Sequence, residues 1–132
     1  MSSELFWVAA TALITALMWV PYILSLLGQL GIVAALSDGN AGTAPSAVWA
    51  QRAKRAHTNA VENLVVFAPL AIGIHVAGLS SGTTATACAV FFFTRLVHYL
   101  VYTAGIPFVR TLSFAVGWLC QMVLALALLG WA

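Results

Sequence analysis

Charged side chains are scarce in this sequence of 132 residues. Only 6% of the residues are Asp, Glu, Lys or Arg, whereas a soluble domain carries about 25%. So few charges cannot cover a surface that faces water, which excludes a soluble enzyme, a disordered tail and a nucleic-acid-binding protein. The hydrophobic share of 63% and the mean hydropathy of +1.03 place the chain in a lipid bilayer instead.

Cysteine is scarce too. The only two, Cys88 and Cys120, lie in apolar stretches. They match neither the spacing of a metal site nor a disulfide framework, so we predict no metal site and interpret both as small packing residues.

Long stretches without charge set the number of membrane spans. Residues 5–37, 63–94 and 111–132 contain no Asp, Glu, Lys or Arg, and a helix needs about 20 apolar residues to cross a bilayer. Four crossings fit this pattern. We predict an all-α integral membrane four-helix bundle, a single domain over residues 1–132, with helices at about 5–36, 45–78, 83–104 and 108–131.

Turn-forming residues and prolines mark the expected breaks. The run Ser-Asp-Gly-Asn at residues 37–40 is predicted to end the first helix. Pro45 suits the first turn of the second helix, because its fixed φ and missing N–H cost nothing there. Pro21 and Pro69 fall inside predicted helices, where we expect kinks.

The basic residues indicate the orientation. All of them flank the first and third connections between helices, and none flanks the second: they are Arg52, Lys54, Arg55, Arg95 and Arg110. By the positive-inside rule, the first and third connections face the cytoplasm and both termini lie on the opposite side.

Polar residues form one face of the second predicted helix. At 100° per residue, Arg52, Arg55, Asn59, Glu62 and Asn63 share an arc of about 100°. Ionisable groups that face lipid cost several kcal/mol, so we expect this stripe to turn toward protein or a wet cavity. The nearby imidazole of His57 lies off the stripe, and we interpret it as a helix-contact or interfacial residue.

The next two helices add polar groups to the same membrane layer. Arg95, His98 and Tyr102 recur at helical spacing, and Arg110 lies near the start of the fourth helix. Glu62 could pair with one arginine and simply join helices, but one carboxylate cannot neutralise several guanidinium groups. Because unpaired arginines at membrane depth are costly, we predict a small ligand with carboxylates, which arginine binds with forked donors.

Two blocks of the sequence resemble the MAPEG family, the membrane-associated proteins of eicosanoid and glutathione metabolism. The first block is residues 51–63, with Arg52, Arg55, Ala56, His57, Asn59, Glu62 and Asn63 at the positions of the family signature. The second block comprises Arg95, His98 and Tyr102, followed by Pro107, Arg110 and Ser113-Phe114. In size and four-span layout the likeness covers the whole chain, which is similar to small bacterial members, so we expect the bacterial inner membrane.

The resemblance implies a homotrimer whose active sites lie between neighbouring subunits and face the cytoplasm. In the glutathione-using branches, glutathione is a co-substrate, and the matching pocket residues here are Arg55, Asn59, Glu62, Arg95, His98, Tyr102 and Arg110. Arg52 joins this predicted binding set from its place on the polar stripe. The residue at Arg110 is implied to act on the thiol, and the thiolate is the nucleophile. A lipophilic second substrate would arrive from the bilayer.

Three functions fit these observations. The first is a glutathione transferase or peroxidase in which a thiolate attacks a lipophilic electrophile or a hydroperoxide is reduced. The second is a non-catalytic lipid-binding or scaffold protein of the same family. The third, a small transporter or channel subunit, needs a polar path across the membrane, whereas the second predicted helix is almost wholly apolar beyond Asn63.

Overall fold

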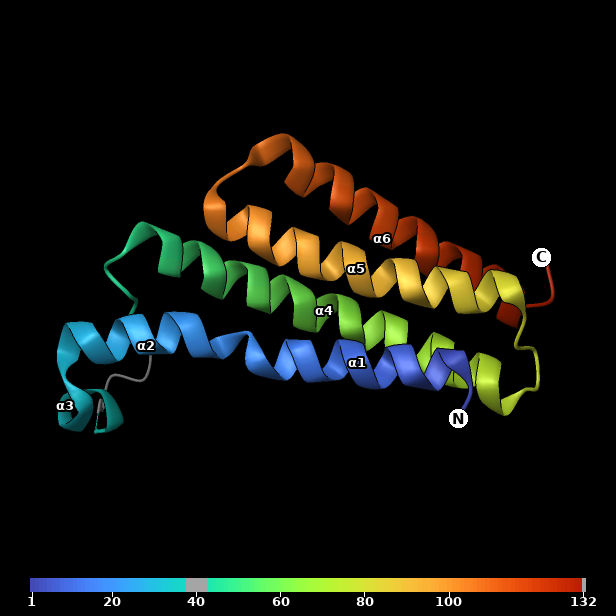
Figure 1. The fold of residues 1–132 in the computed structure, drawn as a ribbon, viewed down its shortest axis with the longest axis horizontal. Helices are drawn as coiled ribbons and strands as arrows, with labels where there is room; N and C mark the ends of the chain where they lie inside the picture. Colours follow the sequence, from blue (N-terminus) through green and yellow to red (C-terminus); the bar gives the residue numbers. More distant parts are fainter. Residues whose placement is uncertain (38–42, 132) are drawn as a thin grey trace.

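The structure, a computed structural model, describes residues 1–37 and 43–131, which form an elongated helical bundle (Figure 1). Its helices are α1 (Ser3–Leu17), α2 (Trp19–Leu30), α3 (Ile32–Leu36), α4 (Val48–Val76), α5 (Gly82–Ala104) and α6 (Pro107–Leu128). Because α1 and α2 run nearly in line, the described residues contain four apolar segments long enough to cross a membrane. The predicted all-α membrane four-helix bundle is confirmed.

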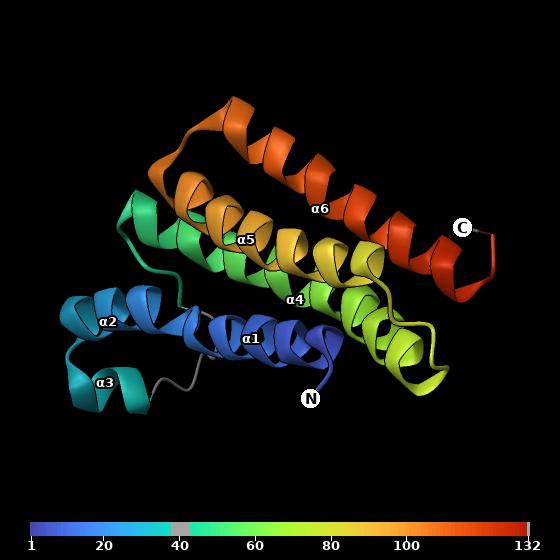
Figure 2. The same cartoon turned by 45° about the vertical axis from the view of Figure 1, so that its right-hand side comes forward.

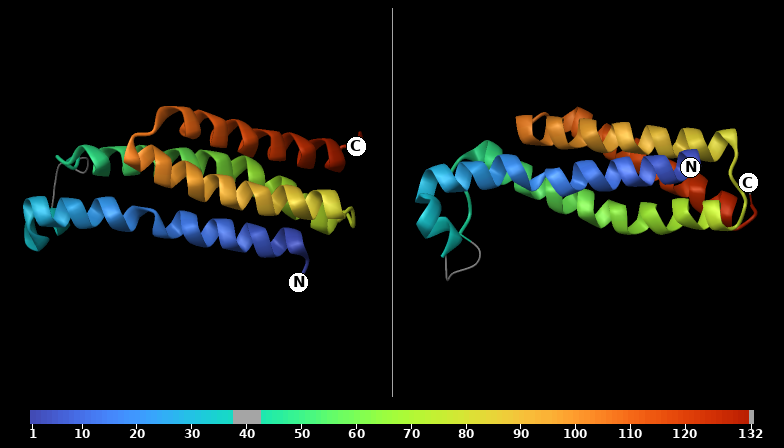
Figure 3. Two further views of the ribbon diagram at one scale, coloured as in Figure 1. Left: turned by 45° about the horizontal axis from the view of Figure 1, so that its top comes forward. Right: turned by 60° about the horizontal axis from the view of Figure 1, so that its bottom comes forward.

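Helices α4 and α5 form the middle of the bundle, since they contact each other and both contact α1 and α6. Both termini lie at the same end as the connection between α4 and α5, and the turn between α5 and α6 lies at the other end (Figure 2). The short α3 folds back beside α2 at that second end (Figure 3). The bundle therefore has two chemically different ends, and all basic residues lie in the half nearer the α5–α6 turn.

The first membrane segment is not the continuous helix predicted over residues 5–36. It breaks at Met18, one turn before Pro21, whose ring cannot fit against the preceding turn of a regular helix. The hydroxyl of Tyr99 donates to the carbonyl of Met18 at 2.9 Å, which compensates the break from a neighbouring helix. A second break at Gly31, with φ of +83°, uses a conformation that favours glycine.

The other helix ends lie close to their predicted positions. Helix α4 begins at Val48 rather than at Pro45, whose carbonyl accepts a hydrogen bond from Nε2 of Gln51 at 2.9 Å. Pro69 lies inside α4 without interrupting it. Of the run at residues 37–40 predicted to end the first helix, Ser37 follows the last residue of α3 and residues 38–40 lie outside the described residues.

An alanine face on α4 lets this helix approach its neighbours closely. Ala50, Ala53 and Ala56 are fully buried, and Ala60 nearly so, in a cluster with residues of α2 and α5. Such small side chains are typical of tight helix packing in membranes. Toward the other end the core is larger, and the rings of Phe67 and Phe91 stack 4.0 Å apart.

A buried carboxylate connects α1 to the start of α5 at the end of the bundle that holds the termini. Glu4 is only 1% exposed, and its two oxygens accept hydrogen bonds from Thr84 Oγ1 at 2.5 Å and Ser80 Oγ at 3.1 Å. Thr84 also accepts a bond from the backbone N–H of Ser81, as part of a capping box. This network fixes the position of α1 along α5.

Replacing Thr84 by Val should destabilise the protein, because Glu4 then loses its short hydrogen bond while remaining buried. We expect a loss of about 1–3 kcal/mol. The measurement is thermal unfolding in detergent, with Thr86→Val as the matched control, since Thr86 is an exposed threonine of the same helix. Equal stability of the two variants would contradict a structural role for the Glu4 network.

Candidate anion-binding site

The guanidinium of Arg95 is the most deeply buried charged group of the predicted polar layer. Arg95 is 2% exposed, and its Nη2 donates to Oδ1 of Asn59 on α4 at 2.5 Å. The same Nη2 lies 3.4 Å from Nδ1 of His98, one turn further along α5. Its Nε and Nη1 have no hydrogen-bond partner among the described residues. Two buried nitrogen donors therefore remain free inside the bundle.

The part of the chain that the structure describes places no carboxylate against this charge. Among the described residues, no Asp or Glu lies within 4.0 Å of a basic side chain. Glu4 lies at the far end of the bundle in the network described above, and Glu62 is exposed on α4. Because a buried charge without a counter-ion costs several kcal/mol, this part of the structure is suited to bind an anion.

A chain of amide side chains holds the Asn59 acceptor in place. Nδ2 of Asn63 donates to the backbone carbonyl of Asn59 at 2.9 Å and to its Oδ1 at 3.3 Å. Nε2 of Gln121 on α6 donates in turn to the backbone carbonyl of Asn63 at 3.2 Å and to its Oδ1 at 3.3 Å. The amides thus connect α4 to α6, and Asn59 connects both to Arg95 on α5.

Arg110 lies beside this cluster at the start of α6. Its Cζ is 5.0 Å from the centroid of the Tyr102 ring, which is within the range of a cation–π interaction. The His98 ring lies 5.5 Å from the Tyr102 ring and 6.3 Å from that of Phe114. The structure therefore brings together five of the residues predicted to bind or act on a ligand, namely Asn59, Arg95, His98, Tyr102 and Arg110.

The predicted stripe on the second helix does not stay on one side. Arg55 and Glu62, at one edge of the arc, are exposed, whereas Asn59 and Asn63 turn inward. Arg52 is half-buried, but its Nε donates to the backbone carbonyl of Thr103 at 3.1 Å. An arc of about 100° is wide enough to span both a protein-facing and an outer face of α4, which the helical wheel alone cannot distinguish.

The structure also shows side chains near the site that were not among the predicted ligand-binding residues. The hydroxyl of Tyr22 on α2 lies 2.7 Å from Nδ1 of His57, in line with a helix-contact role for this histidine. Asn63 and Gln121 support the site without having been assigned to it. Helical spacing could have indicated both, because Asn63 shares a helix face with Asn59 and Gln121 shares one with Arg110. That spacing does not predict which groups they would hydrogen-bond.

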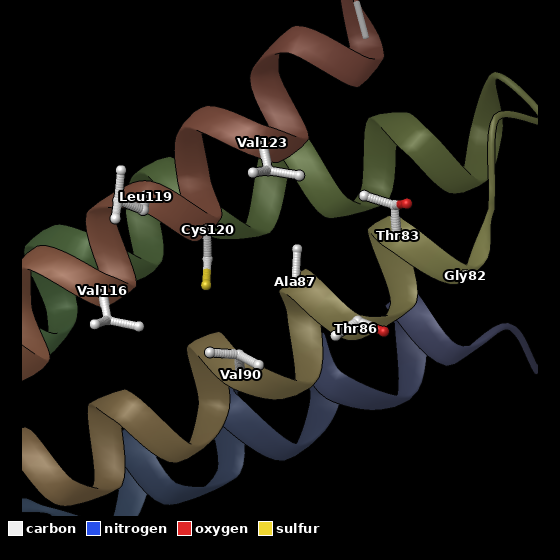
Figure 4. A pocket seen from close by; sticks show the side chains of 9 residues that line it. All are labelled: Gly82, Thr83, Thr86, Ala87, Val90, Val116, Leu119, Cys120 and Val123. Atoms are coloured by element: carbon white, nitrogen blue, oxygen red, sulfur yellow. The ribbon is translucent and has the colours of Figure 1, made fainter.

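An apolar groove lies between α5 and α6 in the half of the bundle away from Arg95 (Figure 4). It has a volume of about 480 Å³ and is lined by Gly82, Thr83, Thr86, Ala87, Val90, Val116, Leu119, Cys120 and Val123. The sulfur of Cys120 points into it. Without a charged group, this groove suits an apolar molecule rather than the anion expected at Arg95.

The sequence model of the MAPEG family matches residues 5–130. The chain belongs to the MAPEG family. A search among curated proteins and another among solved structures gave no match. The match confirms the resemblance found in the two sequence blocks, and MAPEG membership makes this an integral membrane protein of a glutathione-associated family. The cluster around Arg95 is thus where the MAPEG chain concentrates its polar chemistry.

If Arg95 serves to bind a ligand and not to stabilise the fold, its replacement by an apolar side chain of similar length should not lower the thermal stability of the ligand-free protein. We expect Arg95→Met to leave the unfolding temperature unchanged or to raise it by a few degrees, since an uncompensated buried charge is removed. Asn59→Leu should lower it, because the buried guanidinium then loses its Asn59 acceptor. Thermal unfolding in detergent without glutathione measures both, and strong destabilisation by Arg95→Met would show that the arginine is structural.

Proposed function

We propose that this MAPEG protein is a membrane-embedded glutathione-dependent transferase or peroxidase. The observation that carries the proposal is Arg95, a buried guanidinium for which the described residues offer no partner to two of its nitrogen atoms and no carboxylate to compensate its charge. A bound anion would satisfy both donors. It would also explain why the bundle retains a charge that costs stability.

Glutathione matches the charges around this site. It carries two carboxylates and one ammonium, so arginines would bind the carboxylates and Glu62 the ammonium. We assign ligand binding to Arg55, Asn59, Glu62, Arg95, His98 and Tyr102. Arg52, which the sequence also placed in this set, has a different partner in the structure and is considered below.

Arg110 would activate the thiol. A guanidinium next to the sulfur favours the thiolate, which is the nucleophilic form. The thiolate sulfur would form a bond to an electrophilic carbon of a substrate from the bilayer, while the leaving group departs with the electron pair of its broken bond. With a lipid hydroperoxide, two glutathione molecules would instead be oxidised to the disulfide as the hydroperoxide is reduced to an alcohol and water.

We further propose that the protein is a homotrimer with its active sites between neighbouring subunits. The support is the exposed edge of α4, which includes Arg55 and Glu62. Glu62 lies about 15 Å along the helix from Arg52, well inside the membrane, where a carboxylate facing lipid costs several kcal/mol. A neighbouring subunit would cover this edge and bring Arg55 and Glu62 into a composite site.

We also propose an orientation of the bundle in the membrane. The termini share one end of the bundle and the basic residues lie in the other half. We place that basic half at the cytoplasmic face of a bacterial inner membrane, by the positive-inside rule.

The second candidate function is a non-catalytic lipid-binding scaffold. The apolar groove between α5 and α6 favours it, since an acyl chain could occupy such a groove without any chemistry. A scaffold would bind lipid and form no thiolate, which separates the two candidates in one experiment.

Arg110→Ala should abolish thiolate formation. We expect the ultraviolet difference absorbance of the thiolate to appear when glutathione is added to the wild type in detergent, and to be lost in the variant. Turnover of a model electrophile should fall by about 10²- to 10³-fold. Lys54→Ala removes a cation from the exposed face of α4 and is the matched control, in which the signal should persist. Absence of the signal in the wild type would reject the enzyme and favour the scaffold.

Bulk on the exposed edge of α4 should break the assembly. Val65 is 67% exposed and shares this edge with Glu62. We expect Val65→Trp to prevent close approach of neighbouring subunits and to convert trimers to smaller species. Leu119→Trp is the control, because Leu119 is a similarly exposed residue near the middle of α6. Native mass spectrometry of the detergent-solubilised protein counts the subunits, and a trimer that survives Val65→Trp would rule out this edge as the interface.

A further inference from the structure

The side chain of Arg52 reaches from α4 to the end of α5. Its Nε donates to the backbone carbonyl of Thr103 at 3.1 Å. Thr103 belongs to the last turn of α5, which ends at Ala104. The guanidinium therefore lies where the carbonyl groups of α5 lack partners within the helix, and where the helix dipole favours a positive charge.

The carbonyl groups at this helix end are almost fully accounted for. The N–H of Gly105 donates to the carbonyl of Tyr102 at 3.0 Å, and the N–H of Ile106 to that of Val101 at 2.9 Å. These two bonds have the pattern of a Schellman motif. The motif leaves out the carbonyl of Thr103, and Arg52 supplies its donor.

Gly105 makes room for the arginine. Its φ of +81° lies in the left-handed region, which favours glycine. A Cβ on this residue would lie 3.0 Å from Cζ of Arg52 and 3.2 Å from its Nη1. The guanidinium thus packs directly against the turn between α5 and α6, and a larger residue would displace it.

This turn joins two residues of the proposed active site. Tyr102 lies in the last turn of α5, and Arg110 lies near the start of α6, which begins at Pro107. Arg110 Cζ lies 5.0 Å from the Tyr102 ring. The geometry of the turn sets the direction in which α6 departs, and therefore where Arg110 lies relative to Tyr102.

We propose that Arg52 is a positioning residue that caps α5 and holds the α5–α6 turn, so that Arg110 stays over Tyr102. It acts on the catalytic arginine through the backbone and does not contact the ligand. The effect on thiol activation rests on the function proposed above, whereas the cap itself does not.

Hydrogen exchange measured by mass spectrometry tests the cap in the full-length protein in detergent. Arg52→Ala should accelerate exchange of residues 101–111 by about 10-fold, because the turn loses its side-chain donor, while Lys54→Ala should leave it unchanged. Gly105→Ala provides a second variant, since it disturbs the same contact without removing a charge, and it should reproduce the faster exchange. Unchanged exchange in both Arg52→Ala and Gly105→Ala would overturn the proposal.

Glutathione binding and turnover separate positioning from ligand contact. In Arg52→Ala we expect kcat and the thiolate signal to fall by about 10-fold while the Kd for glutathione stays within 2-fold, with partial rescue by Arg52→Lys. A Kd that rises as much as kcat/KM falls would show that Arg52 contacts glutathione and would overturn the proposal. If the wild type binds no glutathione, the proposed function fails, and exchange of residues 107–111 alone decides whether Arg52 holds the start of α6.

Discussion

The burial of Arg95, against which the described residues place no carboxylate, is the constraint around which the polar half of the bundle is arranged. In water, hydrogen bonds would satisfy every N–H of this guanidinium. In the bundle its partners are one amide oxygen and an imidazole. Asn63 on α4 and Gln121 on α6 hold that oxygen in place through their hydrogen bonds. Such an arrangement sacrifices stability for a preorganised positive site, which is typical of binding and catalytic centres.

Two arginines connect α4 and α5 in opposite directions. Arg52 donates from α4 to the backbone of α5, and Arg95 donates from α5 to Asn59 of α4. Because the helices are antiparallel, these bonds lie about two turns apart and bracket the segment that includes His98 and Tyr102. The alanine face of α4 keeps the two helices close enough for both bonds. Helices α4 and α5 are therefore held together on both sides of this segment along the bundle.

The sequence predicted the number of spans, the polar layer and most of the residues that the structure gathers around Arg95. Charge-free stretches and helical spacing suffice for these, because both depend on local pattern. The break at Met18 lies one turn before Pro21, where the sequence predicted a kink, and the break at Gly31 lies at a glycine with a positive φ. The bond from Arg52 to Thr103 depends instead on which helix lies against which, and that information is not local. The division of the α4 stripe, with Glu62 outward and Asn59 inward, has the same origin. The pairing of Glu4 with α5 also joins residues far apart in the sequence.

That last pairing has a consequence for biogenesis. The partners of Glu4 follow it by 76 and 80 positions, so they leave the ribosome only after a further membrane segment, α4, has been made. Until then, the newly made amino-terminal segment has a carboxyl group near its amino-terminal end without the hydroxyl groups that bind it in the finished bundle. The segment must keep that end among lipid headgroups and water, and only the arrival of α5 lets it settle into the bundle. The first membrane segment to be made can thus complete its polar contacts only when the start of α5 is in place.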